Sequence, residues 1–266
     1  MFWQDKVIVI TGGSSGLGKE LAQAFGQAGG KVVIAALEPE IVDVAVTELQ
    51  QEGIDCAGLA CNVTSDEDVE KLKSFVLDKY GKVDVLVNVA GRTDRGKMLD
   101  WTADKFEKVM KLNFFALVRV THAFLPELLK TQGRIINIGS LASKSASRWT
   151  GAYPASKHAV AAYSQQLRLE LGSQGLKVLL VCPGPIARET ERLYPLEGLE
   201  DLPESARRPG AGVKVKKLDP KKLVAAILNA SEKGLPELVM PWKARLLFAI
   251  QQLFPRLGDW LVQKNT

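Results

Sequence analysis

A tyrosine and a lysine stand four residues apart at Tyr153 and Lys157, and none of the other three tyrosines has a lysine at that spacing. On a helix the spacing places phenol and ammonium on one face. Pro154 is tolerated in a first helical turn, so Tyr153 should lie where a helix begins. A phenol with a pKa of ~10 is a poor base at neutral pH, and a neighbouring cation favours its anionic form. The pair indicates acid–base chemistry, although the same short pattern also occurs by chance in amphipathic helices.

Other polar residues follow predicted strands and should meet this pair. Ser140 comes directly after the strand predicted at Arg134–Ile138 and the glycine that follows it. The segment Asn88-Val89-Ala90-Gly91 ends another strand, and Pro183-Gly184 ends a third. Because ligands of parallel sheets bind beyond the carboxyl ends of the strands, we expect these segments to border one site.

A glycine-rich segment, Thr11-Gly12-Gly13-Ser14-Ser15-Gly16-Leu17-Gly18, joins the first predicted strand to the first predicted helix, Leu17–Gly29. Glycines let the backbone turn tightly and approach a pyrophosphate, and the helix N-terminus adds a favourable dipole. Such a turn is weak evidence alone. Its position between a strand and a helix strengthens the interpretation as a dinucleotide site.

The end of the second strand, Ala35-Ala36-Leu37-Glu38, bears on the choice of dinucleotide. No aspartate stands at the tip to bind both ribose hydroxyls, and no adjacent arginine could pair with a 2′-phosphate. The small Ala36 leaves room for that phosphate, and Ser14 and Ser15 could donate to it. Glu38 could instead accept from an unphosphorylated ribose. We therefore favour NADP and leave NAD open.

The elements that position these residues alternate between strands and helices, which predicts an α/β fold with a parallel sheet covered on both faces. No Pro/Gly/Ser linker and no repeat interrupts the order, so we expect one dinucleotide-binding and catalytic domain over residues 1–241. A long loop over the active site is expected at Pro183–Pro220, followed by a helix near Lys221–Ser231 and a strand near Leu238–Met240. The six earlier strands are predicted at Lys6–Thr11, Lys31–Ala36, Ala57–Cys61, Val83–Asn88, Arg134–Ile138 and Leu176–Val181.

Composition excludes a disordered chain, because 46% of the 266 residues are apolar and 24% are charged. Three cysteines without metal-ligand spacing indicate reduced core thiols and no metal site. The first six residues run directly into an apolar strand, which leaves no room for a signal peptide. No uncharged apolar run approaches the ~20 residues that span a bilayer. These features predict a cytoplasmic protein.

The last part of the chain, residues 242–266, is an amphipathic basic extension. Trp242 and Trp260 flank large apolar residues with Lys243, Arg245 and Arg256 between them. Residues 207–266 hold 12 basic and 4 acidic side chains, a net charge of +8. The composition suits contact with an anionic lipid surface or with a bulky apolar substrate. Packing on the chain's own domain or on a subunit partner explains it as well, and no nucleic-acid partner is expected.

Taken together, these motifs resemble the short-chain dehydrogenase/reductase superfamily in its compact single-domain form, over roughly residues 5–240. The resemblance implies a three-layer Rossmann fold with a doubly wound parallel sheet of about seven strands. It implies NAD(P)-dependent interconversion of an alcohol and a ketone, and often a homodimer or homotetramer built on the two long helices that flank the site.

The resemblance also implies roles for individual residues. Tyr153 would be the general acid or base, Lys157 would bind the nicotinamide ribose and lower the tyrosine pKa, Ser140 would hold the substrate oxygen, and Asn113 would orient a relay water. Residues that would contact the dinucleotide are Gly12, Ser14, Ser15, Gly16, Leu17, Gly18, Leu37, Asn62, Val63, Asn88, Ala90, Gly91, Tyr153, Lys157, Pro183, Gly184 and Ile186. Leu17 is equally typical of a core position.

Three residues depart from the family pattern. Asn62 stands where an aspartate usually contacts adenine, Val89 replaces the second asparagine of Asn-Asn-Ala-Gly, and Arg188 occupies the place of a threonine, with Thr190 nearby. His122 and His158 are not expected to act in catalysis. The leading hypothesis is an NADP(H)-dependent oxidoreductase with a small-molecule, hydrophobic or lipid-like substrate. The alternative is a low-turnover dinucleotide-binding protein that acts through partners or membrane association.

Overall fold

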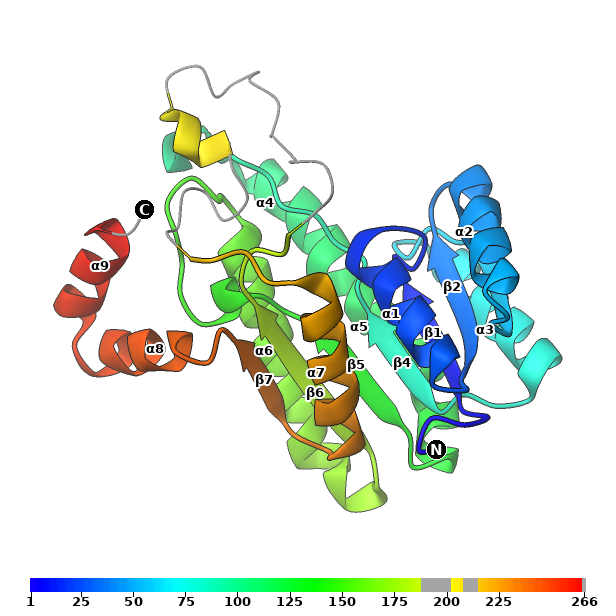
Figure 1. The fold of residues 1–266 in the computed structure, drawn as a ribbon. Helices are drawn as coiled ribbons and strands as arrows, with labels where there is room; N and C mark the ends of the chain where they lie inside the picture. The colour runs from blue at the N-terminus through cyan, green and yellow to red at the C-terminus, as the bar shows by residue number, and fades with distance from the viewer. Residues whose placement is uncertain (188–201, 208–214, 265–266) are drawn as a thin grey trace.

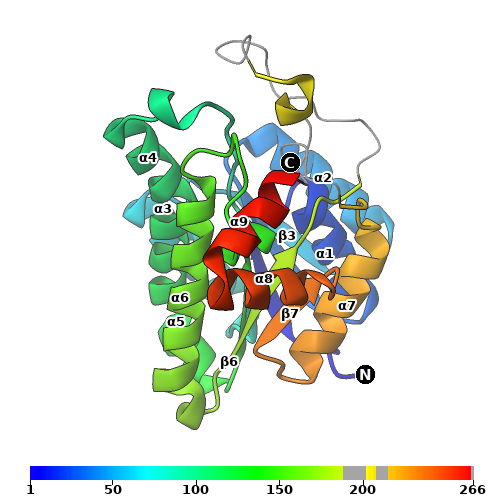
Figure 2. The same ribbon diagram turned by 90° about the vertical axis from the view of Figure 1, so that its left-hand side faces the viewer.

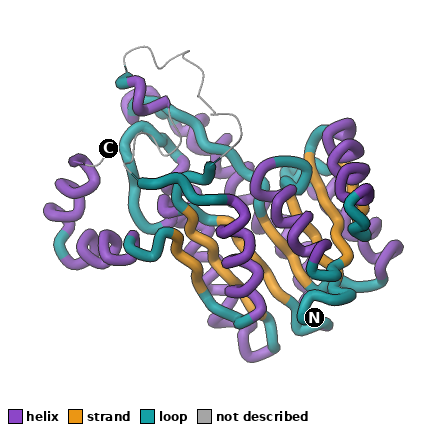
Figure 3. The backbone as a smooth tube through the Cα atoms, viewed as in Figure 1, coloured by secondary structure: helices purple, strands orange, loops and turns teal. Residues whose placement is uncertain are grey.

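The computed structural model describes residues 1–187, 202–207 and 215–264. Seven parallel strands form one sheet in the order β3-β2-β1-β4-β5-β6-β7, with helices on both faces (Figures 1 and 3). The strands are β1 (Val7–Thr11), β2 (Lys31–Ala36), β3 (Cys56–Ala60), β4 (Val85–Asn88), β5 (Arg134–Ile138), β6 (Lys177–Pro183) and β7 (Glu237–Met240). The order reverses between β1 and β4, which defines a doubly wound sheet. The predicted three-layer Rossmann fold is confirmed.

Helices cover the two faces of the sheet in two separate sets (Figure 2). One face packs against α1, α2 and α7, and the other packs against α3, α5 and α6. The described α-helices are α1 (Gly16–Gln27), α2 (Pro39–Gln51), α3 (Asp66–Tyr80), α4 (Ala103–Met110), α5 (Ala116–Lys130), α6 (Tyr153–Leu171), α7 (Pro220–Glu232), α8 (Ala244–Leu253) and α9 (Pro255–Lys264).

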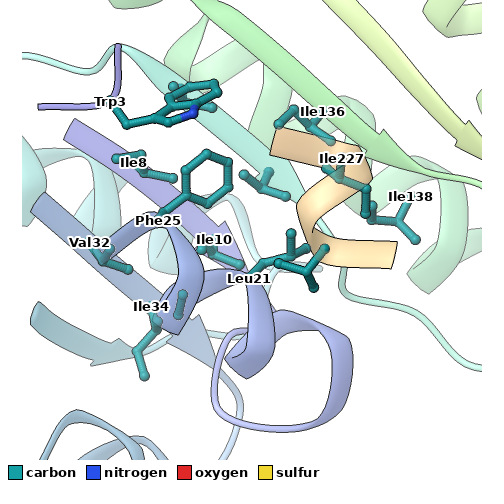
Figure 4. Close-up of a cluster of buried hydrophobic side chains, with 14 of the residues drawn as sticks. Trp3, Ile8, Ile10, Leu21, Phe25, Val32, Ile34, Ile136, Ile138 and Ile227 are labelled. Atoms are coloured by element: carbon teal, nitrogen blue, oxygen red, sulfur yellow. The ribbon is translucent and has the colours of Figure 1, made fainter. Parts of the chain in front are cut away.

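The two cores follow from the alternation of side chains along each strand. In β1, Ile8 and Ile10 point toward α1 and α7, whereas Val7 and Val9 point toward the opposite layer. Figure 4 shows the first of these cores, where Phe25 of α1 meets Trp3 edge-on with ring centroids 4.9 Å apart. Because both faces of the strands are buried, the strands are almost wholly apolar.

The helices α4 and α5 are joined without a break by a π-helical turn, Lys111–Phe115. The combined helix, Ala103–Lys130, is the one helix in the described ranges that is long and apolar enough to cross a membrane. Residues such as Val120, Phe124 and Leu128 pack it against the sheet, which accounts for its apolar composition. All three cysteines are free and buried, as the sequence predicted.

The loop predicted at Pro183–Pro220 is described only in part, and Arg188 and Thr190 lie outside the described residues. A parallel bridge joins Ile186 to Leu218, and a 3₁₀ turn covers Glu204–Arg207. Beyond β7, α8 and α9 form a helical hairpin next to that edge strand (Figure 1). The proposed division into residues 1–241 and 242–266 stays a prediction.

Candidate active site

The glycine-rich turn between β1 and α1 is held by hydrogen bonds to two neighbouring strands. Gly12 N donates to Ala35 O at 2.7 Å, which anchors the turn to β2. Thr11 Oγ1 accepts from Val89 N at 3.1 Å and from Ala90 N at 3.3 Å, which anchors the segment after β4 to the turn. Residues 88–91 therefore border the turn, as the sequence predicted. The contribution of the Thr11 hydroxyl was not anticipated.

Two positions of the turn favour glycine for different reasons. A Cβ on Gly18 would lie 2.0 Å from Gly12 O, so α1 can pack this close to the turn only with glycine there. Gly16 has a φ of +50°, a left-handed conformation that favours glycine, and open space surrounds the position of its missing Cβ.

The first turn of α1 carries no acidic residue, and the hydroxyl of its N-cap, Ser15, makes no capping hydrogen bond. The free backbone N–H groups of a helix start bind anions. Ser14 is half-buried, Ser15 and Gly16 are exposed, and Leu17 packs at the edge of the core. This end of the site fits a dinucleotide diphosphate, and Leu17 serves mainly as a packing residue.

At the end of β2, Leu37 is 60% exposed, and no basic side chain stands next to it in sequence. Asn62 is exposed, and its Oδ1 accepts from the backbone N of Thr64 at 3.0 Å and from its hydroxyl at 2.8 Å. That carbonyl oxygen is already engaged, which leaves the Nδ2 group as the donor toward a base. Val63 is buried, so its side chain is part of the core.

Tyr153 and Lys157 lie at the start of one helix, as their spacing predicted. Tyr153 is the first residue of α6, and its N–H donates to Thr150 O at 3.1 Å. The Lys157 Nζ lies 5.8 Å from the centroid of the Tyr153 ring. Lys157 is 6% exposed and donates to Ile138 O at 2.7 Å. Burial lowers the pKa of its ammonium to about 8.

Asn113 lies in the π-helical turn and is buried beside the pair. Its Oδ1 accepts from Arg92 N at 2.8 Å, and its Nδ2 donates to Arg92 O at 2.8 Å and to Ser156 Oγ at 3.1 Å. Both amide protons are used, so the side chain fastens the segment after Gly91 to α6. Its expected action on a relay water stays a prediction, and π-helical turns are frequent at functional sites.

Gly91 lies next to both the Asn113 amide and the Lys157 ammonium. A Cβ at Gly91 would lie 3.0 Å from Asn113 Oδ1 and 3.8 Å from Lys157 Nζ. A side chain there would crowd the Asn113 amide and would lie in contact with the ammonium. The segment after β4 therefore passes directly over the amide and the ammonium.

Ser140 caps a short 3₁₀ helix, Leu141–Ser143, directly after β5. Its Oγ accepts from Ala142 N at 3.1 Å, and its N–H donates to Ser143 Oγ at 3.1 Å. The reciprocal bonds form a capping box that orients the hydroxyl while leaving its own proton free to donate. Sequence reasoning missed Ser143, although its position three residues after a serine is the spacing of that motif.

The side chain of Asn88 points into the protein interior, and its expected contact with a ribose stays a prediction. Its side chain is 4% exposed, and its Nδ2 donates to Thr121 Oγ1 at 3.2 Å and to Asn137 Oδ1 at 2.9 Å. Asn137 continues the chain of bonds by donating to Ser164 Oγ at 2.9 Å. The Asn88 side chain thus ties β4 and β5 to the helices beneath them, which leaves its backbone to face a ligand.

Gly184 follows β6 and donates to Met240 O at 2.7 Å. A Cβ there would meet Leu141 Cδ1 at 3.4 Å, so the end of β6 runs beside the Ser140 segment. Pro183 is the last residue of β6, and Ile186 is half-buried at the edge of the core. The predicted meeting of strand ends at one site is therefore present.

A pocket of about 410 Å³ opens beside the start of α6. Gly96 pairs with Thr150 in a parallel bridge, which joins the loop after β4 to the loop before α6 and closes one side of the pocket. Its lining residues are Gly96, Met98, Phe106, Ala146, Ser147, Arg148, Trp149, Thr150, Gly151, Pro154 and Ala155. Apart from Pro154 and Ala155, which lie between Tyr153 and Lys157, these residues carried no recognisable sequence signal, because the pocket forms between segments that meet only in the fold.

The two histidines lie apart from this chemistry. His122 is exposed on α5, and His158 Nδ1 bonds to Pro154 O at 2.8 Å on α6. No group of three His, Cys, Asp or Glu side chains suited to a metal ion occurs in the ranges that the structure describes.

Known proteins resemble this chain in sequence. The family model described as short chain dehydrogenase matches residues 6–195. A dehydrogenase/reductase SDR family member 7B from Danio rerio is 39% identical over 188 residues, which cover 68% of this chain and 61% of the relative. A putative ketoacyl reductase from Streptomyces coelicolor is 36% identical over 196 residues, which cover 71% of this chain and 75% of the relative.

Solved structures agree in fold. An actinorhodin polyketide ketoreductase with NADPH has a TM-score of 0.78 and 26% identity, and the match covers 90% of this chain and 97% of that one. A short chain dehydrogenase/reductase from Burkholderia phymatum in complex with NAD has a TM-score of 0.84 and 22% identity over 97% of this chain and 96% of that one, a likeness of fold alone. The chain belongs to the short chain dehydrogenase family.

Proposed function

We propose that this protein is an NADP(H)-dependent oxidoreductase that interconverts a ketone and a secondary alcohol on an apolar or lipid-like substrate. The observation that carries the proposal is the placement of Tyr153 at the start of α6, with the buried ammonium of Lys157 5.8 Å from its ring centroid. Gly91 and Asn113 complete the surroundings of that ammonium. A protein that had lost its enzymatic activity would not need to keep all of these residues.

Tyr153 is the proton carrier. In reduction its phenol gives a proton to the carbonyl oxygen, and in oxidation the phenolate takes the proton from the alcohol. When bound, the nicotinamide supplies or accepts the hydride. Ser140 Oγ still has a proton to donate, so it can hold the substrate oxygen while charge develops there.

Lys157 supports the tyrosine and the cofactor together. Its bond to Ile138 O uses one of three ammonium protons, which leaves two for a ribose hydroxyl and the phenol. Its positive charge favours the phenolate. Burial lowers the pKa of Lys157 to about 8, so its charge is sensitive to pH in the weakly alkaline range.

The preference for NADP rests on the end of β2. No acidic side chain follows Ala36 immediately, and the exposed Leu37 leaves the region next to the ribose uncharged. Ser14 and Ser15 supply hydroxyls for a 2′-phosphate. The actinorhodin ketoreductase with NADPH is the more similar of the two solved structures in sequence, at 26% against 22% identity.

The apolar character of the substrate rests on the pocket beside α6. Met98, Phe106 and Trp149 dominate its wall, and Arg148 is the one charged side chain among its described lining residues. A substrate with an extended apolar part would gain most from this wall.

We also propose that the protein forms homodimers or homotetramers and works in a reducing, cytoplasmic compartment. Phe115 and Leu169 are 53% and 77% exposed on the long helices that flank the site, where a second copy could cover them. The buried free cysteines support the compartment. Light scattering of the purified protein tests the first proposal, since a monomer at micromolar concentration would refute it.

The enzymatic proposal is tested by following NADPH oxidation with ketones that differ in apolar size, and by identifying the alcohol formed. We expect turnover to rise with apolar size and to be lost in Tyr153→Phe. If the protein binds NADPH but turns over no ketone in the series, the alternative of a dinucleotide-binding protein with little turnover is favoured.

A further inference from the structure

The C-terminal hairpin, residues 242–264, exposes an unusual concentration of large apolar side chains. Fifteen such side chains are exposed in the described residues, and six of them lie between residues 242 and 260. They are Trp242 (65%), Leu246 (60%), Leu253 (73%), Phe254 (61%), Leu257 (47%) and Trp260 (53%). Single exposed apolar residues are ordinary, whereas six on one pair of packed helices point to an interaction surface.

A glycine fixes how the two helices of the hairpin meet. A Cβ on Gly258 would lie 2.6 Å from Gln251 Cα, so α9 crosses α8 in direct backbone contact at this point. Gly258 is the one buried residue of α9 in the described range. The two helices therefore form one unit rather than two independent arms.

The hairpin is attached to the body through α8. Ala244 and Phe248 pack against the core cluster around Val160 and Val239. Arg245 lies 3.7 Å from Glu237 Oε1 and also donates to Glu237 O at 3.4 Å, which ties α8 to β7. Figures 1 and 2 both place α8 and α9 outside this edge of the sheet, so the apolar cluster is held at a defined place on the molecule.

Basic side chains accompany the apolar ones. Residues 242–264 contain Lys243, Arg245, Arg256 and Lys264 against a single acid, Asp259, for a net charge of +3. The Lys264 Nζ lies 5.0 Å from the centroid of the Trp260 ring, so charge and aromatic surface occur together. Lysine and arginine beside tryptophan and leucine are the composition of helices that lie in a lipid interface.

We propose that the C-terminal hairpin docks this protein on a membrane surface that contains anionic lipid. Its helices have ten residues each and are about 15 Å long, half the hydrocarbon thickness, so they lie along the interface and do not cross it. A second copy is the weaker occupant, because a two-fold contact through this surface would bring the basic side chains Lys243, Arg256 and Lys264 of two copies together. An anionic leaflet complements the same charge.

The test is co-sedimentation of the full chain with vesicles of phosphatidylcholine alone and with vesicles that also contain phosphatidylserine. We expect binding to the second kind only, and at least a tenfold loss when salt is raised from 50 to 500 mM, on the order of what screening of several charges produces. Binding should also fall at least about tenfold in Trp242→Ser/Trp260→Ser and in Lys243→Glu/Arg256→Glu.

The matched control is Ile41→Ser/Val44→Ser, which removes two exposed apolar side chains from α2, beside the opposite edge of the sheet. This variant should bind vesicles like the unmodified protein. All variants are first compared by their thermal unfolding transitions, so that unfolding is not mistaken for lost binding.

Failure of the unmodified protein to bind the anionic vesicles would overturn the proposal, as would an equal loss in the α2 control. A change of oligomeric state in the hairpin variants without any vesicle binding by the parent would identify the hairpin as a contact between copies. The test does not use turnover, so its outcome is independent of the proposed enzymatic activity.

Discussion

The two ends of the candidate active site depend on different kinds of contact. The β1–α1 turn depends on close backbone packing, because a Cβ on Gly18 would lie 2.0 Å from Gly12 O. The start of α6 depends on buried side chains. Lys157 is held by a hydrogen bond to Ile138, and Asn113 is held by hydrogen bonds to Arg92 and Ser156. Cofactor binding and proton chemistry should therefore be separable by substitution, except at residues that serve both.

Lys157 is the residue whose substitution should affect cofactor binding and proton transfer together. Replacement by alanine removes the cation beside the phenol and the donor toward the ribose. We expect turnover to fall by about 10²–10⁴-fold and cofactor affinity by about 10-fold or more, the range for a charged hydrogen bond. Steady-state kinetics and NADPH titration check the two effects. A variant with lower turnover and unchanged affinity would assign Lys157 to the proton chemistry alone.

The buried ammonium also makes stability depend on pH. Burial lowers the pKa of Lys157 from 10.5 to about 8, so between these values the unfolded chain binds more protons than the folded protein. Stability of the cofactor-free protein should rise with pH across this window, by on the order of 3 kcal/mol relative to Lys157→Met. Urea unfolding of both proteins at neutral and at alkaline pH measures the difference. Parallel pH dependence in the two proteins would contradict the assignment.

At the other end, Gly18→Ala places a methyl group against backbone that cannot move without opening the turn. We expect a loss of about 1–3 kcal/mol in the free energy of unfolding and a loss of NADPH binding. Gly172→Ala is the matched control, because its missing Cβ has no heavy atom within 4 Å apart from the neighbouring residues of its own helix and chain. Equal behaviour of the two variants in thermal unfolding and in NADPH titration would show that the close approach does not matter.

The smallest expected effect concerns the choice of cofactor. Leu37→Arg places a guanidinium at the exposed end of β2, where it can pair with a 2′-phosphate in a bidentate manner. Affinity for NADPH should increase several-fold, up to about 10-fold, while affinity for NADH changes little. Competitive titration with both reduced cofactors checks this. Tighter binding of NADH by the unmodified protein would transfer the selecting role to Glu38.

Much of this arrangement could be predicted because its causes are local. The spacing of Tyr153 and Lys157 translates directly into one helix face, and the apolar runs with glycine between them define the strands and the first turn. The location of Asn62, which replaces the usual aspartate of the family, could also be predicted, because it follows the strand β3. In each case the residues that determine the local structure lie close together in the sequence.

The rest depended on contacts between distant segments. Asn113 meets Arg92 and Ser156, which lie 21 and 43 residues away in sequence. The pocket forms where Gly96 pairs with Thr150, and the residue types at these two positions do not predict a bridge between them. Asn88 turned out to serve a buried network because Thr121 and Asn137 meet it from other elements. Side-chain partners of this kind require the assembled fold.

Under the proposed function, Tyr153 transfers the proton while the β1–α1 turn holds the cofactor. The most direct measurement compares Tyr153→Phe with Tyr163→Phe, which removes a phenolic hydroxyl from the same helix ten residues further on. For each variant, NADPH affinity and ketone turnover are measured on one preparation. We expect Tyr153→Phe to bind NADPH within about two-fold of the parent but to lose about 10²–10⁴-fold in turnover, whereas Tyr163→Phe should keep both. Near-normal turnover by Tyr153→Phe would contradict it.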